Sequence, residues 1–157
     1  MTYTKDLSIV ISLFNEEESL PELISWIEKV MAAEGYSYEV IMVDDGSRDA
    51  TMFQLRKLFQ EQKCPVKVVS FSRNFGKEAG MFAGLQHACG EYTALIDADL
   101  QQRPEVVLEM LSHLNEDPEL DCVAAYQDKR NEGKIISFLK SSFYKIINKI
   151  SDVRFVN

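Results

Sequence analysis

The sequence has few of the residues that mark specialised classes of protein. Its three cysteines, Cys64, Cys89 and Cys122, have a spacing that fits neither a zinc site nor a disulfide framework, so we expect reduced thiols in a cytoplasmic chain. No apolar run reaches the ~18 residues needed to span a bilayer, and no signal peptide is expected before the first apolar run. A composition of 46% hydrophobic and 27% charged residues excludes disordered, collagen-like and low-complexity chains.

Basic residues are also scarce, and the net charge is −8 over 157 residues. An acidic domain is poorly suited to nucleic acid, since phosphate neutralisation requires a basic face. The charge is uneven, because residues 129–157 carry +5 and the first 128 residues carry −13. We therefore expect one core-forming domain without nucleic-acid binding, and a basic tail that meets an anionic partner.

Apolar, β-branched runs alternate with helical patterns along the chain. Asn15 is expected to cap the first helix, Gly35 and Gly90 to follow helix ends, and Pro104 to open a helix. The pattern predicts an α/β fold, with a mostly parallel sheet between two helical layers. The predicted strands are 7–13, 38–43, 66–71, 92–96 and 122–126, and the predicted helices are 16–33, 50–62, 77–89, 104–114 and one from 134.

Acidic residues follow the fourth predicted strand. Because extended residues two apart point to the same side, Asp97, Asp99 and Gln101 could present three oxygens to one cation. Hard cations such as Mg²⁺ prefer these ligands and keep substrate phosphates or water as the remainder of their shell. A metal site and a plain acidic loop are the two interpretations, and the position at a strand end favours the metal.

Two further strand ends carry charged residues. Asp44 or Asp45, before a Gly-Ser turn, could accept the N–H groups of a uracil or guanine base, or could simply cap a helix. Arg73 and Lys77 flank Gly76 ahead of a helix, where a diphosphate would be favoured, although Lys77 could equally be a solvated helix start. The remaining polar or small residues are expected to be structural, namely His87, His113, Ala79, Gly80, Ala83 and Gly84.

Four motifs occur in a familiar order: ISLFNEE at 11–17, VDDGS at 43–47, SRNFGKE at 72–78 and DADLQ at 97–101. With them the chain resembles glycosyltransferase family two, of the GT-A fold, and within it the polyprenyl-phosphate glycosyltransferases. The resemblance implies a nucleotide-sugar donor, Mg²⁺ or Mn²⁺ as cofactor, and inverting transfer to a polyprenyl phosphate or another acceptor. A UDP-sugar is favoured as the donor, and a GDP-sugar remains the alternative because a carboxylate can accept from either base. The implied site residues are Phe14, Glu16, Asp44, Asp45, Arg73, Lys77 and Asp97 for the nucleotide and Asp97, Asp99 and Gln101 for the metal.

The chain departs from the family at a few places. Leu13 replaces the usual proline, and Gln102 and Arg103 replace an Asp-Pro pair after the DADLQ motif. Family members also continue with acceptor-side segments, so we expect a fragment whose general base would lie beyond Asn157. The predicted organisation is a nucleotide-sugar-binding domain over 7–133, continued by a helix over 134–151.

The helix over 134–151 has an apolar stripe about 80° wide, with lysines beside it. This pattern is typical of a helix in a membrane interface, but also of one that packs on the sheet or on a second copy of the chain. The resemblance favours the membrane-interface interpretation of this helix. It also implies an enzyme on the cytoplasmic side of the membrane that acts in the synthesis of cell wall or lipopolysaccharide.

Three other classes share parts of this pattern. A nucleotidyltransferase would carry a glycine-rich basic loop after its first strand, where this chain has Phe14 to Glu17. A phospho-receiver module would carry its paired aspartates after the first strand rather than the second. A domain that binds nucleotide without catalysis remains compatible with the sequence.

Overall fold

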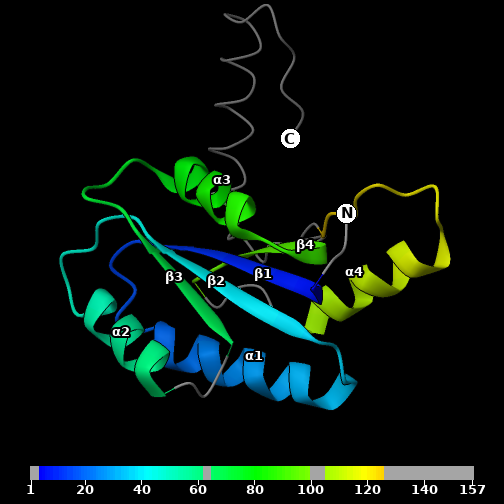
Figure 1. Ribbon diagram of the computed structural model, residues 1–157, viewed down its shortest axis with the longest axis horizontal. Helices are drawn as coiled ribbons and strands as arrows, with labels where there is room; N and C mark the ends of the chain where they lie inside the picture. The colour runs from blue at the N-terminus through cyan, green and yellow to red at the C-terminus, as the bar shows by residue number, and fades with distance from the viewer. Residues whose placement is uncertain (1–3, 62–64, 100–104, 126–157) are drawn as a thin grey trace, which may run out of the picture. The chain divides into compact units, whose positions relative to one another are not determined.

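The structure is a computed structural model that describes residues 4–61, 65–99 and 105–125. The chain divides into two compact units, Met1–Val123 and Ala124–Asn157, and the first contains every described helix and strand. These elements alternate along the chain as four βα units (Figure 1). Their bounds are β1 Lys5–Leu13, α1 Leu20–Glu34, β2 Tyr38–Asp44, α2 Thr51–Glu61, β3 Val66–Ser70, α3 Lys77–His87, β4 Gly90–Asp97 and α4 Glu105–Glu116.

The strands form one parallel sheet in the order β3-β2-β1-β4. Helices α1, α2 and α4 cover one face and α3 covers the other (Figure 1). Strand β1 is central, and its alternate side chains enter two cores, with Ile9 on the α1 side and Val10 on the α3 side. This arrangement confirms the predicted α/β class with a parallel sheet between helical layers.

The larger core lies between the sheet and α1, α2 and α4. It is built from aliphatic residues that recur at period two in the strands and at helical spacing in the helices. Each fully buried Leu or Ile contributes roughly 1.5–3 kcal/mol through removal of its apolar surface from water. The largest such side chains include Leu7, Ile9, Ile11, Leu13, Leu23, Ile27 and Leu55.

Small residues allow α3 to approach the sheet closely. A Cβ added at Gly80 would overlap the Ser12 hydroxyl, and one added at Gly84 would overlap a Val10 methyl group. Ala83 packs into the same smaller core. These contacts confirm the structural role expected for these three residues.

The start of α1 differs from the expectation. The helix begins at Leu20 and places Pro21 in its first turn, where a missing N–H costs nothing. Asn15 is not its cap, because it has a positive φ of 57° and its side-chain oxygen accepts a hydrogen bond from the Arg48 N–H. Gly35, with φ 73°, ends the helix as expected.

Two further expectations are wrong. Helix α3 ends at His87 instead of Cys89, because the Cys89 N–H donates to Glu39 and Ser8, and Gly90 begins β4. Residues 122–125 do not form a strand. Pro104, Gln101 and the helix expected over 134–151 lie outside the described residues.

Candidate functional site

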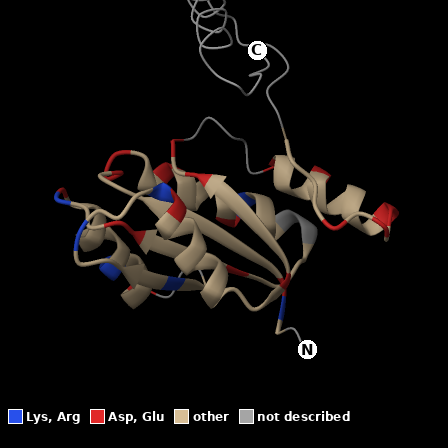
Figure 2. Ribbon diagram, turned by 90° about the horizontal axis from the view of Figure 1, so that it is seen from above, with Lys and Arg blue, Asp and Glu red and all other residues tan. Residues whose placement is uncertain are grey.

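The four parallel strands end level with one another at one edge of the sheet. Leu13 of β1 pairs with Asp44 of β2, Asp44 pairs with Ser70 of β3, and Ser12 pairs with Asp97 of β4. The loops that follow the strands therefore lie along this carboxyl edge, and Figure 2 shows both acidic and basic residues among these loops. Sheets of this type bind ligands at this edge.

Asp44 and Asp45 lie beneath the loops, each only 2% exposed. The Asp44 carboxylate accepts a hydrogen bond from the Ser47 N–H at 3.1 Å. The two Asp45 oxygens accept from the N–H groups of Phe75 at 2.7 Å and Gly76 at 2.9 Å. In the structure, these carboxylates hold the 71–76 loop and the turn after β2 in place.

The turn after β2 requires glycine at position 46. Gly46 has φ 69°, a conformation that other residues rarely adopt. A Cβ at this position would lie 2.7 Å from the Cα of Arg73. This close approach, together with the Asp45 hydrogen bonds, fixes the 71–76 loop against the end of β2.

The loop after β1 is fastened to the segment before α2. The Asn15 N–H donates to the Ser47 hydroxyl at 2.9 Å, and the Glu16 N–H donates to the Thr51 hydroxyl at 2.8 Å. The Glu16 carboxylate accepts a hydrogen bond from the Ser19 hydroxyl. Phe14 is not covered by these contacts, and 42% of it is exposed at the edge of the sheet.

A cation and an aromatic ring project from the loop after β3. The Arg73 guanidinium carbon lies 4.2 Å from the centroid of the Phe75 ring, within the range of a cation–π contact. Phe75 also meets Phe71 edge to face at 5.5 Å, yet remains 51% exposed. An exposed ring and a guanidinium group next to each other are suited to contact with a planar base or a phosphate.

The fourth strand end carries an ion pair. Lys77, the first residue of α3, places its Nζ 2.6 Å from Oδ1 of Asp97, the last residue of β4. The side chains are 55% and 34% exposed. The structure thus brings together two predicted site residues that are twenty positions apart in the sequence.

Two carboxylates at the end of β4 could take part in holding a cation. Asp99 is exposed two residues after Asp97, and Gln101 lies outside the described residues. The described part of the chain contains no cluster of three or more His, Cys, Asp or Glu side chains suited to a metal. The donor set fits a hard cation that takes its remaining ligands from phosphate and water, and the Lys77 ammonium shows that a positive charge is accommodated beside Asp97.

A second polar cluster, which was not predicted from the sequence, lies at the opposite, amino edge of the sheet. Glu39 is 3% exposed, and its carboxylate pairs with Lys67 at 2.7 Å and accepts hydrogen bonds from Ser8 at 2.6 Å and the Cys89 N–H at 2.9 Å. Burial alone would raise the pKa of Glu39, but these partners outweigh it and lower the pKa to about 2. The only signal in the sequence was a serine and a glutamate inside apolar strands.

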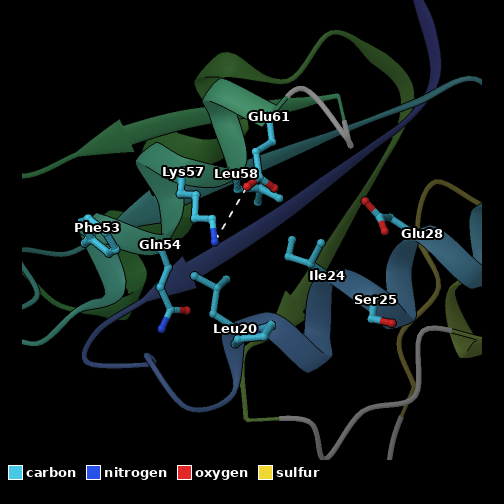
Figure 3. Close-up of a pocket in the computed structure, with 10 residues that line it drawn as sticks. Leu20, Ile24, Ser25, Glu28, Phe53, Gln54, Lys57, Leu58 and Glu61 are labelled. Atoms are coloured by element: carbon cyan, nitrogen blue, oxygen red, sulfur yellow. Dashed lines mark ion pairs between the residues drawn. The ribbon is translucent and has the colours of Figure 1, made fainter.

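A groove of about 460 Å³ lies between α1 and α2 (Figure 3). Leu20, Ile24 and Leu58 give it an apolar lining, and the Lys57–Glu61 ion pair at 3.8 Å lies at its side. None of the residues predicted for the site lines this groove. Among the residues that the structure describes, no helix combines the length and apolar character needed to cross a bilayer.

The parallel sheet and the charged loops at its carboxyl edge define an α/β class of protein that binds ligands at this edge, and comparison with known proteins identifies the family. The family model described as glycosyl transferase family 2 matches residues 8–154. The chain belongs to this family. This assignment favours the glycosyltransferase interpretation over the nucleotidyltransferase and phospho-receiver alternatives.

The names of two curated relatives refer to polyprenyl compounds, dodecaprenyl phosphate and bactoprenol. The chain is 36% identical over 136 residues to the dodecaprenyl-phosphate galacturonate synthase of Rhizobium johnstonii. This match covers 87% of this chain and 40% of the relative. It is 34% identical over 145 residues to the bactoprenol glucosyl transferase of Shigella phage SfV. This second match covers 92% of this chain and 47% of the relative. The chain thus spans about half the length of the curated relatives it matches, and it is polyprenyl-phosphate glycosyltransferase-like.

A solved structure shares the fold. The mannosyltransferase PcManGT from Pyrobaculum calidifontis, in complex with GDP-Man and Mn²⁺, matches with a TM-score of 0.62 and 24% identity, over 79% of this chain and 37% of that one. The predicted GT-A architecture is therefore confirmed.

Proposed function

We propose that the chain is the donor-binding part of a metal-dependent glycosyltransferase that passes a sugar from a nucleoside diphosphate to a polyprenyl phosphate. The observation that carries the proposal is the meeting of Asp97 and Lys77 at 2.6 Å on the carboxyl edge of the sheet. A carboxylate for a cation and an ammonium for a phosphate are the two charges that a metal–diphosphate ligand requires. The relatives' names supply the lipid phosphate as the acceptor class.

The nucleotide is proposed to lie along the loops at the carboxyl edge. Its base would lie near Phe14 and Glu16, over the turn that carries Asp44 and Asp45. The exposed Phe14 ring supports this placement, whereas the two buried aspartates would act chiefly by holding the loops. A UDP-sugar is the proposed donor, and a GDP-sugar is the comparison to test.

The diphosphate is proposed to face Arg73 and Lys77. Asp97 and Asp99, with Gln101 from outside the described residues, would hold Mg²⁺ or Mn²⁺ beside it. The cation would neutralise the charge that develops on the leaving diphosphate. The side chains would orient the donor, and Lys77 would add a second positive charge at its phosphates.

The proposed transfer proceeds with inversion at the sugar. An oxygen of the acceptor phosphate forms a bond to the anomeric carbon while the bond from that carbon to the donor diphosphate breaks. The bonding electron pair leaves on the nucleoside diphosphate. We assign no general base among the described residues.

The helix expected over 134–151 is proposed to meet the membrane surface, on its cytoplasmic side, in the complete enzyme. Its apolar stripe and lysines also suit contact with a second copy of the chain. The acceptor class suggests a role in building cell wall or lipopolysaccharide.

Calorimetric titration of the 157-residue chain with UDP and GDP, each with EDTA, Mg²⁺ or Mn²⁺, tests the proposal. We expect UDP to bind at least about tenfold more tightly with the metal, since the cation offsets the diphosphate charge. GDP is the matched comparison for base preference, and uridine, which lacks phosphates, is the control for the metal effect. Equal binding of UDP in EDTA and in Mn²⁺ would overturn the metal-dependent function.

A further inference from the structure

We propose that Lys77 makes cation binding depend on the sugar nucleotide, because its ammonium occupies Asp97 until a diphosphate takes the ammonium away. The inference rests on the proposed function and adds an order of binding, in which the nucleotide draws Lys77 away before Asp97 can bind the cation. Without nucleotide, the carboxylate is neutralised by the protein itself. With nucleotide, Lys77 turns to the phosphates, and the oxygen that it leaves becomes a cation ligand.

The Lys77 ammonium and a metal ion would compete for the same carboxylate oxygen, Oδ1 of Asp97. The 2.6 Å distance between Lys77 Nζ and Asp97 Oδ1 is a full charge-assisted hydrogen bond. A metal ion bonded to the same oxygen would lie within a few ångströms of the ammonium, and the two cations would repel each other. Direct coordination by this oxygen therefore requires the ammonium to leave.

The exchange has a low cost because the pair is near the surface. More than half of the Lys77 side chain is exposed, and about a third of the Asp97 side chain. An ion pair that is partly exposed contributes little free energy of stabilisation, and the four-carbon lysine side chain is flexible. A diphosphate carries more negative charge than one carboxylate, so it competes effectively for the ammonium.

The two residues come from elements whose positions are fixed. Asp97 ends β4, which is paired with β1 as far as Ser12. Lys77 begins α3, whose approach to Ser12 is set by Gly80, and Gly76 just before it is held by the Asp45 carboxylate. The side chains can therefore exchange partners without movement of the sheet or of α3.

The test measures Mn²⁺ binding in the absence of nucleotide, from the electron paramagnetic resonance signal of free Mn²⁺. Lys77→Met should bind Mn²⁺ about threefold more tightly than the original chain, the fold-change that corresponds to loss of a part-exposed pair. Arg73→Met is the matched control, because it removes a cation at the same edge that pairs with Phe75 rather than Asp97. Lys77→Arg keeps the charge and should bind Mn²⁺ as the original chain does.

The same variants are then titrated with UDP at saturating Mn²⁺. Lys77→Met should bind UDP more weakly, so that the substitution has opposite effects on the two ligands. A merely structural role of Lys77 would weaken the binding of both ligands. A general charge effect would raise the Mn²⁺ affinity of Arg73→Met, measured without nucleotide, as much as that of Lys77→Met. Unchanged Mn²⁺ affinity in Lys77→Met, or an equal gain in Arg73→Met, would overturn the exchange alone, whereas absence of metal-enhanced nucleotide binding in the original chain would overturn the proposed function as well.

Discussion

The two edges of the sheet use the same kinds of side chain in different ways. At the amino edge, Glu39 is buried, and its carboxylate is bonded to Lys67, Ser8 and Cys89. At the carboxyl edge, Asp97 and Lys77 form a pair that is partly open to solvent. A buried carboxylate with every partner supplied by the chain stabilises a fold, whereas an open pair can exchange its partner for a ligand.

Removal of Glu39 should have the largest effect on stability. Glu39→Ala leaves the Ser8 hydroxyl without its acceptor, removes one of the two acceptors of the Cys89 N–H, and leaves Lys67 without its counter-charge. We therefore expect a loss of about 3 kcal/mol in the free energy of unfolding. Urea denaturation followed by circular dichroism measures it. The folded protein should bind UDP normally, and a loss below about 1 kcal/mol would contradict the role given to this edge.

The same cluster predicts a dependence of stability on pH. The pKa of Glu39 is lowered to about 2 in the folded chain, from about 4.5 when unfolded. Its stabilisation is therefore complete above pH 4.5 and is lost as the pH falls toward 2, by an amount on the order of 3 kcal/mol. The difference between the original chain and Glu39→Gln, followed by urea denaturation from pH 6 to pH 2.5, should shrink with acidification, and a constant difference would count against it.

Asp45 should affect both the stability of the fold and the binding of ligand, because it is buried but holds the loop at the carboxyl edge. Asp45→Asn replaces one of the two oxygens that accept the Phe75 and Gly76 N–H groups, and we expect a loss of about 2 kcal/mol in stability. The loosened loop should also weaken UDP binding, which Glu39→Ala does not. Calorimetric titration of the folded variant with UDP separates the loss of affinity from the loss of stability. An unchanged UDP affinity would show that Asp45 does not position the nucleotide-binding loop.

The smallest stability effect is expected at the open edge. Asp97→Asn and Asp99→Asn should change the free energy of unfolding by about 0.5 kcal/mol or less, yet abolish the enhancement of UDP binding by Mn²⁺. Glu91→Gln, at the other end of β4, is the matched control for loss of one exposed carboxylate. Retention of the metal effect in both Asp variants would place the cation elsewhere.

Much of the fold followed from patterns local in the sequence. The apolar strands, the helices between them and the turn residues predicted a parallel α/β sheet. The late start of α1 was not predicted, although Pro21 indicates it, since proline is tolerated in a first helical turn but not five residues inside a helix. The strand expected at 122–126 failed because a short apolar run does not reveal whether a partner strand lies beside it.

The contacts of the site were harder to predict than its members. The motifs placed Asp45, Lys77 and Asp97 at one edge, but nothing local indicated that Asp45 would bind the backbone of Phe75 and Gly76, or that Lys77 would pair with Asp97. Such pairings depend on strand order and on the approach of α3. Glu39 was missed for the same reason, because its partners come from three other segments of the chain.

The most direct test is a crystal of the chain grown with UDP and MnCl₂, with anomalous diffraction recorded at the manganese absorption edge. The account predicts a manganese peak within bonding distance of a carboxylate oxygen of Asp97 or Asp99, shared with the diphosphate, and the Lys77 ammonium turned to a phosphate oxygen. UDP bound with manganese away from both carboxylates, or with Lys77 still paired to Asp97 while the metal is coordinated, would contradict it.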